Sequence, residues 1–259
     1  MVVPDYHVHT EWSWDAERGS MLETCRRAVA IGLPSIAFTE HADWVRGPAC
    51  VVDVPGYLDS VERCRSQFPG LRILTGVELG EPHRFPDAAA ALLAAGFDRV
   101  LGSVHVIEAP GGLRDASEPG FLGAGDCDEL FRRYLADTQA LIESPAPFDV
   151  LAHLDYPRRY WPPERDYRVE DYDEEMRSLL SALARRGAAL EVNTTRGRVL
   201  CPGPPVLDWW RDAGGERVTF GSDAHSPDLI AEGFREASAM VEAAGFRAHD
   251  DPTQPWIRS

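Results

Sequence analysis

The sequence predicts an α/β fold built on a parallel sheet, either a barrel or a doubly wound sheet. Seven short β-rich segments recur along the chain, and a stretch with helical periodicity follows them in turn. Most of these segments are continuous apolar runs, which is typical of parallel strands buried on both faces. The expected strands are Val2–Val8, Pro34–Phe38, Arg72–Val77, Phe97–Val104, Phe148–Ala152, Ala188–Val192 and Arg217–Gly221.

The first expected helix carries signals for both of its ends. Ser20 and Glu23 form a capping box, in which the serine hydroxyl accepts the backbone N–H of Glu23. Apolar residues then recur at helical spacing as far as Gly32, a residue that ends helices readily. A similar repeat runs from Tyr172 to Leu183. Further helical segments are expected around 56–68, 87–95, 127–143, 204–213 and 228–244.

Two long stretches rich in Pro and Gly interrupt the alternation of strands and helices. These stretches, Ala109–Gly125 and Tyr156–Arg168, do not separate halves of different composition, so we expect loops over a site rather than linkers. No internal repeat is found. We therefore expect one domain over residues 1–259, with the short tail His249–Ser259 packed or frayed at the surface.

Composition and charge are those of a globular protein with an acidic balance. Hydrophobic residues make up 44% of the chain and charged residues 26%, and the formal net charge is −16. This balance argues against a general nucleic-acid surface, so no nucleic-acid partner is expected. There is neither a leader pattern nor an apolar run of about 18 residues, which favours a cytoplasmic protein without a membrane partner. The five scattered cysteines indicate neither a disulfide framework nor a thiolate metal site.

Ligand-type residues follow the expected strands. In parallel α/β folds the C-terminal ends of all strands open on one face, so residues that are distant in sequence meet there. Imidazoles and carboxylates are ligands of zinc, iron and manganese. A lone histidine at a strand end is usually a hydrogen-bonded or surface residue, but a whole set favours a metal site. The set is His7, His9, His41, Glu78, His105, His153, Asp223 and His225.

Two pairs within this set have a spacing suited to one ion. His7 and His9 are alternate residues of an expected strand, so both imidazoles point to the same side. Asp223 and His225 have the same spacing after the last expected strand. Either pair alone is a weak signal, but the two together strengthen the prediction of a metal site.

The sequence resembles the polymerase-and-histidinol-phosphatase (PHP) superfamily at seven motifs. Their order and spacing match over essentially the whole chain, and TEH-x-D, HLDY and EVNT resemble more narrowly its monofunctional histidinol-phosphate phosphatases. The motifs are HVHTEWSWD (7–15), FTEHAD (38–43), GVELG (76–80), GSVH (102–105), AHLDYPRRY (152–160), EVNT (191–194) and GSDAH (221–225).

This resemblance implies a distorted (β/α)7 TIM-like barrel with three divalent metal ions, zinc, manganese or iron, at the C-terminal ends of the strands. The bridging carboxylate that it implies makes chemical sense, because two oxygens offset the repulsion between adjacent cations. The implied ligands are His7, His9, Glu78 and Asp223 for one ion, Glu78, His105 and His153 for a second, and Asp15, His41 and His225 for a third.

The chemistry implied by the resemblance is phosphate-ester hydrolysis. We expect a metal-bridging hydroxide, positioned by Glu78, His153 and Asp223, to attack phosphorus, because coordination lowers the pKa of water from about 16 to about 7. Arginine forks match phosphate geometry in two directions. Arg159 is the first candidate for binding the substrate phosphate. Arg196 and Arg198 are two further candidates.

The resemblance favours L-histidinol phosphate, a small phosphorylated metabolite of histidine biosynthesis, as the substrate. The alternatives are a phosphoesterase for another small phosphomonoester or a nucleotide, and a noncatalytic metal- or phosphate-binding protein. Asp43 and Asp155 each lie two residues after an expected ligand. They either orient an imidazole or bind a substrate amine, or they make purely structural hydrogen bonds.

Overall fold

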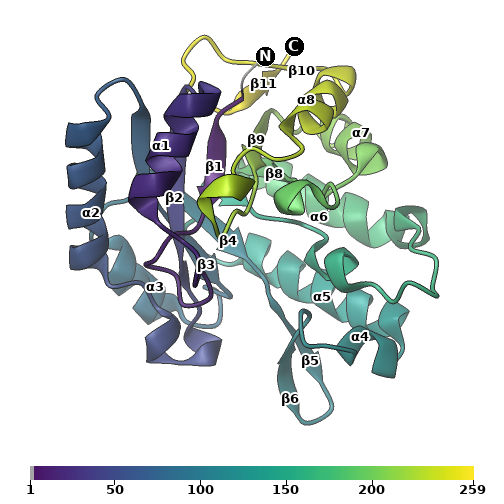
Figure 1. The fold of residues 1–259 in the computed structure, drawn as a ribbon. Helices are drawn as coiled ribbons and strands as arrows, with labels where there is room; N and C mark the ends of the chain where they lie inside the picture. Colours follow the sequence, from purple (N-terminus) through teal and green to yellow (C-terminus); the bar gives the residue numbers. More distant parts are fainter. Residues whose placement is uncertain (1–2) are drawn as a thin grey trace.

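Parallel strands form the centre of the computed structural model, which describes residues 3–259 (Figure 1). In these residues seven parallel strands, β1 to β4 and β7 to β9, are continued by two antiparallel strands, β11 and β10, in one sheet. In sheet order the strands are β1 (Asp5–Val8), β2 (Ser35–Ala42), β3 (Arg72–Gly80), β4 (Arg99–Ser103), β7 (Val150–Leu151), β8 (Ala189–Asn193), β9 (Arg217–Gly221), β11 (Trp256–Arg258) and β10 (Phe246–Arg247).

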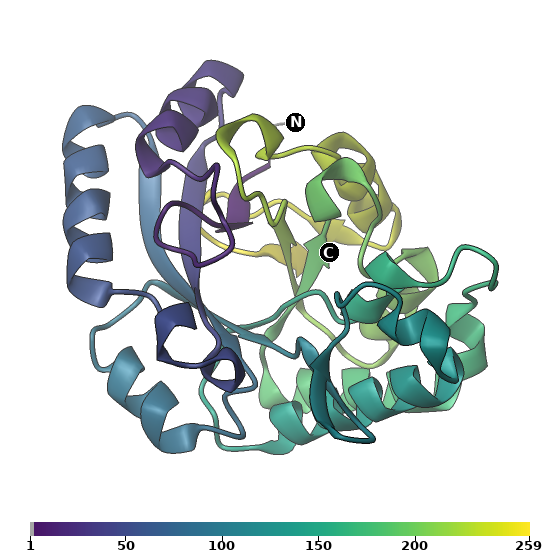
Figure 2. The same ribbon diagram turned by 60° about the horizontal axis from the view of Figure 1, so that its bottom comes forward.

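The helices lie around the outside of the curled sheet, as Figure 2 shows. The predicted α/β class is therefore confirmed as a mixed α/β fold with a half-barrel sheet. The helices are α1 (Met21–Ile31), α2 (Val54–Gln67), α3 (Pro86–Leu93), α4 (Phe121–Ala124), α5 (Cys127–Glu143), α6 (Asp173–Arg186), α7 (Pro204–Asp212) and α8 (Phe234–Ala243).

Helix α1 begins and ends where the sequence predicts. Ser20 is its N-cap and accepts the backbone N–H of Glu23, and Gly32 ends the helix in the left-handed conformation at φ 75°. The last helix, α8, is shorter than the predicted segment 228–244. Gly233, at φ 79°, directly precedes its first turn and separates it from the short 3-10 helix Pro227–Leu229.

Strands β2 and β3 are longer than predicted, so two site residues lie inside a strand instead of after it. His41 and Glu78 were expected to follow their strands, but both lie inside them and pair in register. The parallel ladder continues through the polar residues because each side chain there has buried polar partners. The first residue of the expected strand Val2–Val8 lies outside the described residues.

One further prediction is corrected by the structure. The stretch Ala109–Gly125 is not only a loop, because β5 (Val106–Ala109) and β6 (Gly112–Asp115) form a hairpin and α4 follows it.

Of the two outcomes expected for the C-terminal tail, packing is the one that the structure shows, since β11 pairs with β9. Trp256 is 3% exposed, and its ring packs edge-on against Phe220 at 4.9 Å. Burial of this indole favours an ordered C-terminal strand.

The sheet curls so far that the end of β1 meets the segment after β9. The backbone N–H of His9 donates to Ala224 (2.8 Å), and the N–H of Asp223 donates to the carbonyl of His7 (2.8 Å). The buried Asp5 carboxylate strengthens this junction by accepting backbone N–H groups of Ser222 (3.0 Å) and Ala231 (2.9 Å). The first and last ligand pairs of the sequence are therefore hydrogen-bonded neighbours.

Two large apolar clusters join the helices to the sheet. One contains buried residues of α5 to α8, and the other joins α1 and α2 to β1, β2 and β3. Each cluster lies on the outer side of the sheet, so the polar strand ends remain free to form a site. Within the described residues, no helix is both long and apolar enough to cross a membrane.

Removal of a side chain from the larger cluster should destabilise the whole domain. Leu180 of α6 is fully buried, so Leu180→Ala is expected to lower the free energy of unfolding by about 2–5 kcal/mol through lost contacts and a cavity. Val29→Ala on α1 is the control, because Val29 is 51% exposed and its change should stay within about 0.5 kcal/mol. Urea unfolding curves measure both, and equal stabilities would contradict the assigned buried face of α6.

Candidate metal centre

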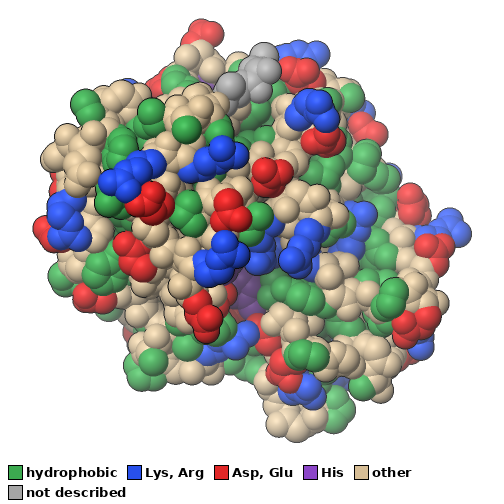
Figure 3. All heavy atoms as spheres, viewed as in Figure 1, with side chains coloured by type: hydrophobic (Ala, Val, Ile, Leu, Met, Phe, Trp, Pro, Cys, Tyr) green, Lys and Arg blue, Asp and Glu red, His purple; other side chains and the backbone are tan. Residues whose placement is uncertain are grey.

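The predicted ligands meet around one cavity. Its empty space, counted together with the solvent that opens onto it, is about 470 Å³. In Figure 3 histidine side chains are visible in a hollow of the surface, with basic and acidic side chains beside them. Of the nine expected ligands, His7 and His9 lie fully buried behind the wall. The lining contains the other seven, which are Asp15, His41, Glu78, His105, His153, Asp223 and His225.

Glu78 lies at the centre of this group. Its Oε1 atom is 2.7 Å from His153 Nε2 and 3.2 Å from His105 Nε2, and its Oε2 atom is 3.1 Å from His7 Nε2 and 3.2 Å from His41 Nδ1. Burial by itself would raise the pKa of this carboxyl, but the surrounding histidines, His7 first, hold it well below its usual value. Glu78 is therefore an ionised carboxylate with both oxygens turned to ligand nitrogens.

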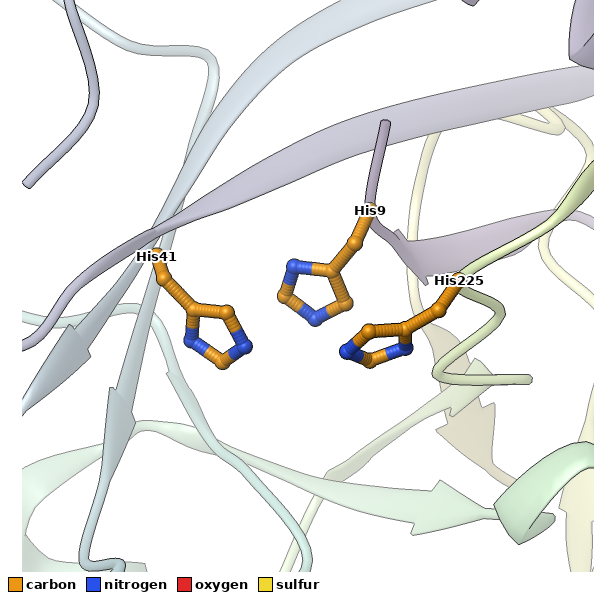
Figure 4. Close-up of side chains that lie close together, drawn as sticks. All are labelled: His9, His41 and His225. Atoms are coloured by element: carbon orange, nitrogen blue, oxygen red, sulfur yellow. The ribbon is translucent and has the colours of Figure 1, made fainter. Parts of the chain in front are cut away.

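The remaining expected ligands extend the group toward the mouth. His9 Nε2 lies 3.5 Å from Asp223 Oδ1, and Asp15 lies 3.0 Å from His225 Nε2 and 3.5 Å from His41 Nε2. The rings of His9, His41 and His225 lie together, and one nitrogen of each is within 4.8 Å of the others (Figure 4). The structure thus brings all nine residues together around one site. The groups whose ligand atoms lie within 4.8 Å of one another are His9, His41 and His225, then His7, His153 and Asp223, then His7, His9 and Glu78, and then His41, Glu78 and His105, so the division into three ligand sets stays a prediction.

The outer partners of two ligand histidines fit a metal centre. His7 Nδ1 is 2.7 Å from Glu191 Oε1, and His105 Nδ1 is 3.2 Å from Asp43 Oδ1. A carboxylate accepts but does not donate, so each ring donates from Nδ1 to its outer acid, and its Nε2 atom faces the Glu78 carboxylate. An Nε2 atom held against a buried carboxylate favours positive charge between the two, and a metal ion supplies it to a ring whose Nδ1 already has an outer acceptor.

The pKa of His7 shows how much negative charge surrounds this group. Burial alone would lower the pKa, but Glu191 and then Glu78 outweigh burial and raise it well above the ordinary value. The pKa of Asp223 is held well below its usual range, because Arg159 and His7 outweigh the effect of burial. The site therefore favours positive charge at its centre, as a cation-binding site does.

Backbone conformation at the strand ends is strained where it presents site residues. His153 has φ 22°, Asp223 has φ 55° and Arg196 has φ 58°, although none is glycine. The packing below them is also close. A Cβ atom on Gly221 would lie 2.1 Å from Glu191 Oε1 and 2.4 Å from His7 Cβ, so only glycine lets β9 approach this pair.

The three candidate arginines differ in position. Arg159 donates through Nη1 to Asp223 Oδ2 (2.5 Å), and its buried Nε and Nη2 atoms have no protein partner. Arg196 also lines the cavity, with an unpartnered Nε atom. Arg198 is exposed and is not among the described residues that line the cavity, because the chain turns at Gly197 with φ 77°. The structure thus separates Arg196 from Arg198, which sequence alone did not.

Asp43 and Asp155 also have different surroundings. Asp43 contacts His105 and accepts from Trp14 Nε1 (2.9 Å), so of the three roles considered for it, its position favours the orientation of an imidazole. Asp155 is buried away from the cavity lining, and its nearest cation is Arg158 at 3.7 Å. Neither carboxylate oxygen of Asp155 has a hydrogen-bond partner among the described residues, so the structure supports none of the roles considered for this residue.

Sequence reasoning missed the partners of the ligands and the rim. Glu191 had a usable signal, since it is a charged residue inside an expected apolar strand. Asp115 and Arg46 pair across the cavity mouth, between the hairpin β5–β6 and the segment after β2. Neither has a strand-end signal, and Asp115 lies in a stretch predicted to be a loop. Only the folded hairpin brings these two side chains to the site.

Comparison with known proteins identifies the family. The family described as "PHP domain" matches residues 5–195, which is most of the chain. The chain belongs to the PHP domain family. The motifs that carry the resemblance in the sequence are thus the motifs of the family, and those up to EVNT lie in the matched range.

Two findings relate this PHP protein to a Lactococcus lactis enzyme. A histidinol-phosphatase of that organism is 28% identical over 253 residues, covering 93% of this chain and 91% of its own. A crystal structure of L. lactis histidinol phosphate phosphatase, complexed with zinc, L-histidinol and phosphate, has a TM-score of 0.83 at 25% identity and 98% coverage of both chains. A Listeria monocytogenes structure of 18% identity shares the fold, with a TM-score of 0.78 and coverage of 90% and 99%.

The two neighbouring arginines of this PHP protein should differ in their effect on anion binding. Arg196→Ala is expected to weaken binding of inorganic phosphate about 10- to 100-fold, since it removes a charge-assisted hydrogen-bond donor from the cavity. Arg198→Ala, the matched control outside the cavity, should leave affinity within about twofold. Calorimetric titration of the zinc-loaded protein measures both, and equal losses would contradict the assignment of Arg196 to the cavity.

Proposed function

We propose that this PHP protein is a metal-dependent phosphomonoesterase that hydrolyses L-histidinol phosphate to L-histidinol and phosphate. The observation that carries this proposal is the convergence of nine ligand-type side chains and two arginines on one small cavity. The relative from L. lactis supports the substrate, because it is a histidinol-phosphatase that matches this chain nearly end to end. The product pair L-histidinol and phosphate occupies the related crystal structure together with zinc.

The nine converging residues would hold three divalent ions of zinc, manganese or iron. The three sets are His7, His9, Glu78 and Asp223, then Glu78, His105 and His153, and then Asp15, His41 and His225. When bound, such ions lower the pKa of coordinated water to about 7 and neutralise charge on phosphoryl oxygens. Glu78, His153 and Asp223 would position the water that attacks phosphorus, since all three face the cavity.

Two arginines would bind the phosphoryl group of the substrate. Arg159 is fixed by its bond to Asp223. Burial by itself would lower the pKa of the guanidinium, but the Asp223 carboxylate outweighs burial and keeps the group charged, with Nη2 free. Arg196 contributes a second cation from the turn after β8. Both guanidinium groups would stabilise negative charge that develops on the phosphoryl oxygens, which is the general role of fixed cations in phosphoryl transfer.

The rim would recognise the amine and ring of histidinol. Asp115 lines the cavity, where it pairs with Arg46, and its carboxylate would also accept from a substrate ammonium that enters the cavity. Trp14, Tyr156 and Tyr160 bring aromatic faces to the same cavity, and Trp14 and Tyr160 remain 41% and 38% exposed. Aromatic faces attract flat rings and cations, which suits an imidazole and an ammonium group.

We also propose that residues 1–259 form one PHP-type domain with a distorted (β/α)7 barrel. Seven parallel strands and the hydrogen bonds between the end of β1 and the segment after β9 support this interpretation. The coverage of the L. lactis chain over 98% of this protein supports a single domain.

A substrate comparison tests the proposed specificity. The zinc-loaded protein should hydrolyse L-histidinol phosphate with a kcat/KM at least about 10-fold above that for 4-nitrophenyl phosphate, which lacks the amine, because one charge-assisted contact contributes about that factor. Asp115→Asn should remove this advantage and leave the second substrate unaffected. Glu108→Gln, on the same hairpin but outside the cavity, is the matched control. Greater turnover of a nucleotide or another phosphomonoester would assign the site to that ester instead.

Removal of the central carboxylate tests the metal dependence. Glu78→Ala should lose both bound metal and turnover, because its two oxygens contact ligands of all three sets. Chelation of the wild-type protein should abolish turnover, and addition of Zn²⁺, Mn²⁺ or Fe²⁺ should restore it. Metal content and phosphate release are the measurements. Full turnover by Glu78→Ala would be incompatible with the proposed centre, and metal binding without turnover of any ester would identify a noncatalytic binding protein.

A further inference from the structure

A buried acid outside the ligand set lies directly behind the metal centre. Glu40 precedes His41 on β2 and is fully buried. Its carboxylate accepts from the backbone N–H of Thr10 (3.0 Å), from the Thr10 hydroxyl (2.6 Å) and from the Ser13 hydroxyl (2.6 Å). All of these donors belong to the turn between β1 and α1, the turn that also carries Asp15.

The Ser13 hydroxyl has three neighbours whose roles fix its proton. The backbone N–H of His41 lies 3.1 Å from Ser13 Oγ and can only donate to it. Glu40 Oε2 already accepts the N–H of Thr10, so this oxygen is an acceptor and takes the Ser13 proton. The third neighbour, His9 Nδ1 at 3.1 Å, must then donate to Ser13. This direction holds whether or not the other carboxyl oxygen carries a proton.

The consequence for His9 is a defined tautomer. With its proton on Nδ1, the neutral ring directs the Nε2 lone pair toward His7 Nε2 (3.1 Å), Glu78 Oε2 (3.4 Å) and Asp223 Oδ1 (3.5 Å). The ring is also held in its plane by stacking on His41, with centroids 4.1 Å apart and an interplanar angle of 14° (Figure 4). His9 therefore presents a ligand atom in the orientation that a metal ion requires.

We propose that Ser13 and Glu40 are positioning residues that hold His9 in its metal-binding tautomer through the chain Glu40–Ser13–His9. The inference rests on the proposed metal centre, to which it adds two residues that do not touch an ion. The hydrogen bond of a ligand histidine to an outer acceptor fixes both its ring orientation and its basicity. Here a hydroxyl carries that effect from a carboxylate on the neighbouring strand.

Thr10 provides a control for the alternative that the hydrogen bonds to Glu40 only anchor the turn between β1 and α1. Thr10 donates its hydroxyl to the same carboxylate at the same distance as Ser13, and both residues are buried, but Thr10 makes no side-chain bond to a histidine. If the network only anchors the turn, removal of either hydroxyl has the same effect. If it positions His9, only removal of the Ser13 hydroxyl changes metal binding.

The experiment compares Ser13→Ala with Thr10→Val in the zinc-loaded full chain. Zinc content is measured during titration with a competing chelator, and thermal unfolding of the metal-free forms is measured in parallel. Ser13→Ala should lower the affinity for at least one zinc ion about 10- to 100-fold, whereas Thr10→Val and Ser13→Thr, which keeps a hydroxyl, should stay within about threefold of the wild type. Ser13→Cys, whose thiol is a weak donor, is a second variant with an expected loss if Ser13→Ala does not fold.

The outcomes separate this inference from the proposed function. Wild-type zinc affinity in Ser13→Ala, or equal losses in Ser13→Ala and Thr10→Val, would overturn the positioning role and leave the metal centre intact. Failure of the wild-type protein to retain zinc would overturn the metal centre itself. A selective loss in Ser13→Ala that Ser13→Thr restores supports the chain Glu40–Ser13–His9.

Discussion

The structure depends on one electrostatic constraint, the burial of an ionised carboxylate among histidine nitrogens. Glu78 is 1% exposed and lies within 3.2 Å of ligand nitrogens from His7, His41, His105 and His153. A buried carboxylate is costly inside a protein unless positive charge lies close to it. Divalent ions would offset this cost. The buried charge of Glu78, which is unfavourable by itself, therefore favours the binding of a cation.

The acids that hydrogen-bond to the ligand histidines fix the orientation of their rings. Glu191 and Asp43 accept the Nδ1 protons of His7 and His105, although Glu191 lies on β8 and Asp43 follows β2, so each acid comes from a segment that does not neighbour its histidine in the sheet order. Gly221 allows the closest of these approaches. The apolar clusters on the outer side of the sheet stabilise the strands against movement, so the ligand atoms are positioned before an ion arrives.

The mouth of the cavity is formed by loops and a hairpin, whereas its floor is formed by strand ends. Its walls come from the hairpin β5–β6, from the turns after β2 and β8 and from the segment after β7. Arg46 and Asp115 join two of these walls, and Arg159 and Arg196 come from the others. Loops of this kind generally tolerate change more readily than strand ends do.

The sequence by itself determined the parallel α/β class, the position of helix α1 and eight of the nine expected ligands, which follow from local periodicity and from the rule that parallel strands end on one face. The ninth, Asp15, is expected only from the resemblance to the PHP superfamily. Only the tertiary structure decided the lengths of β2 and β3, the hairpin that carries Asp115, the choice of Arg196 over Arg198 and the partner that each histidine meets at Nδ1. Such features arise from contacts between segments that are distant in sequence, as with His7 and Glu191, and no local pattern encodes a hydrogen bond that forms only when the sheet has curled.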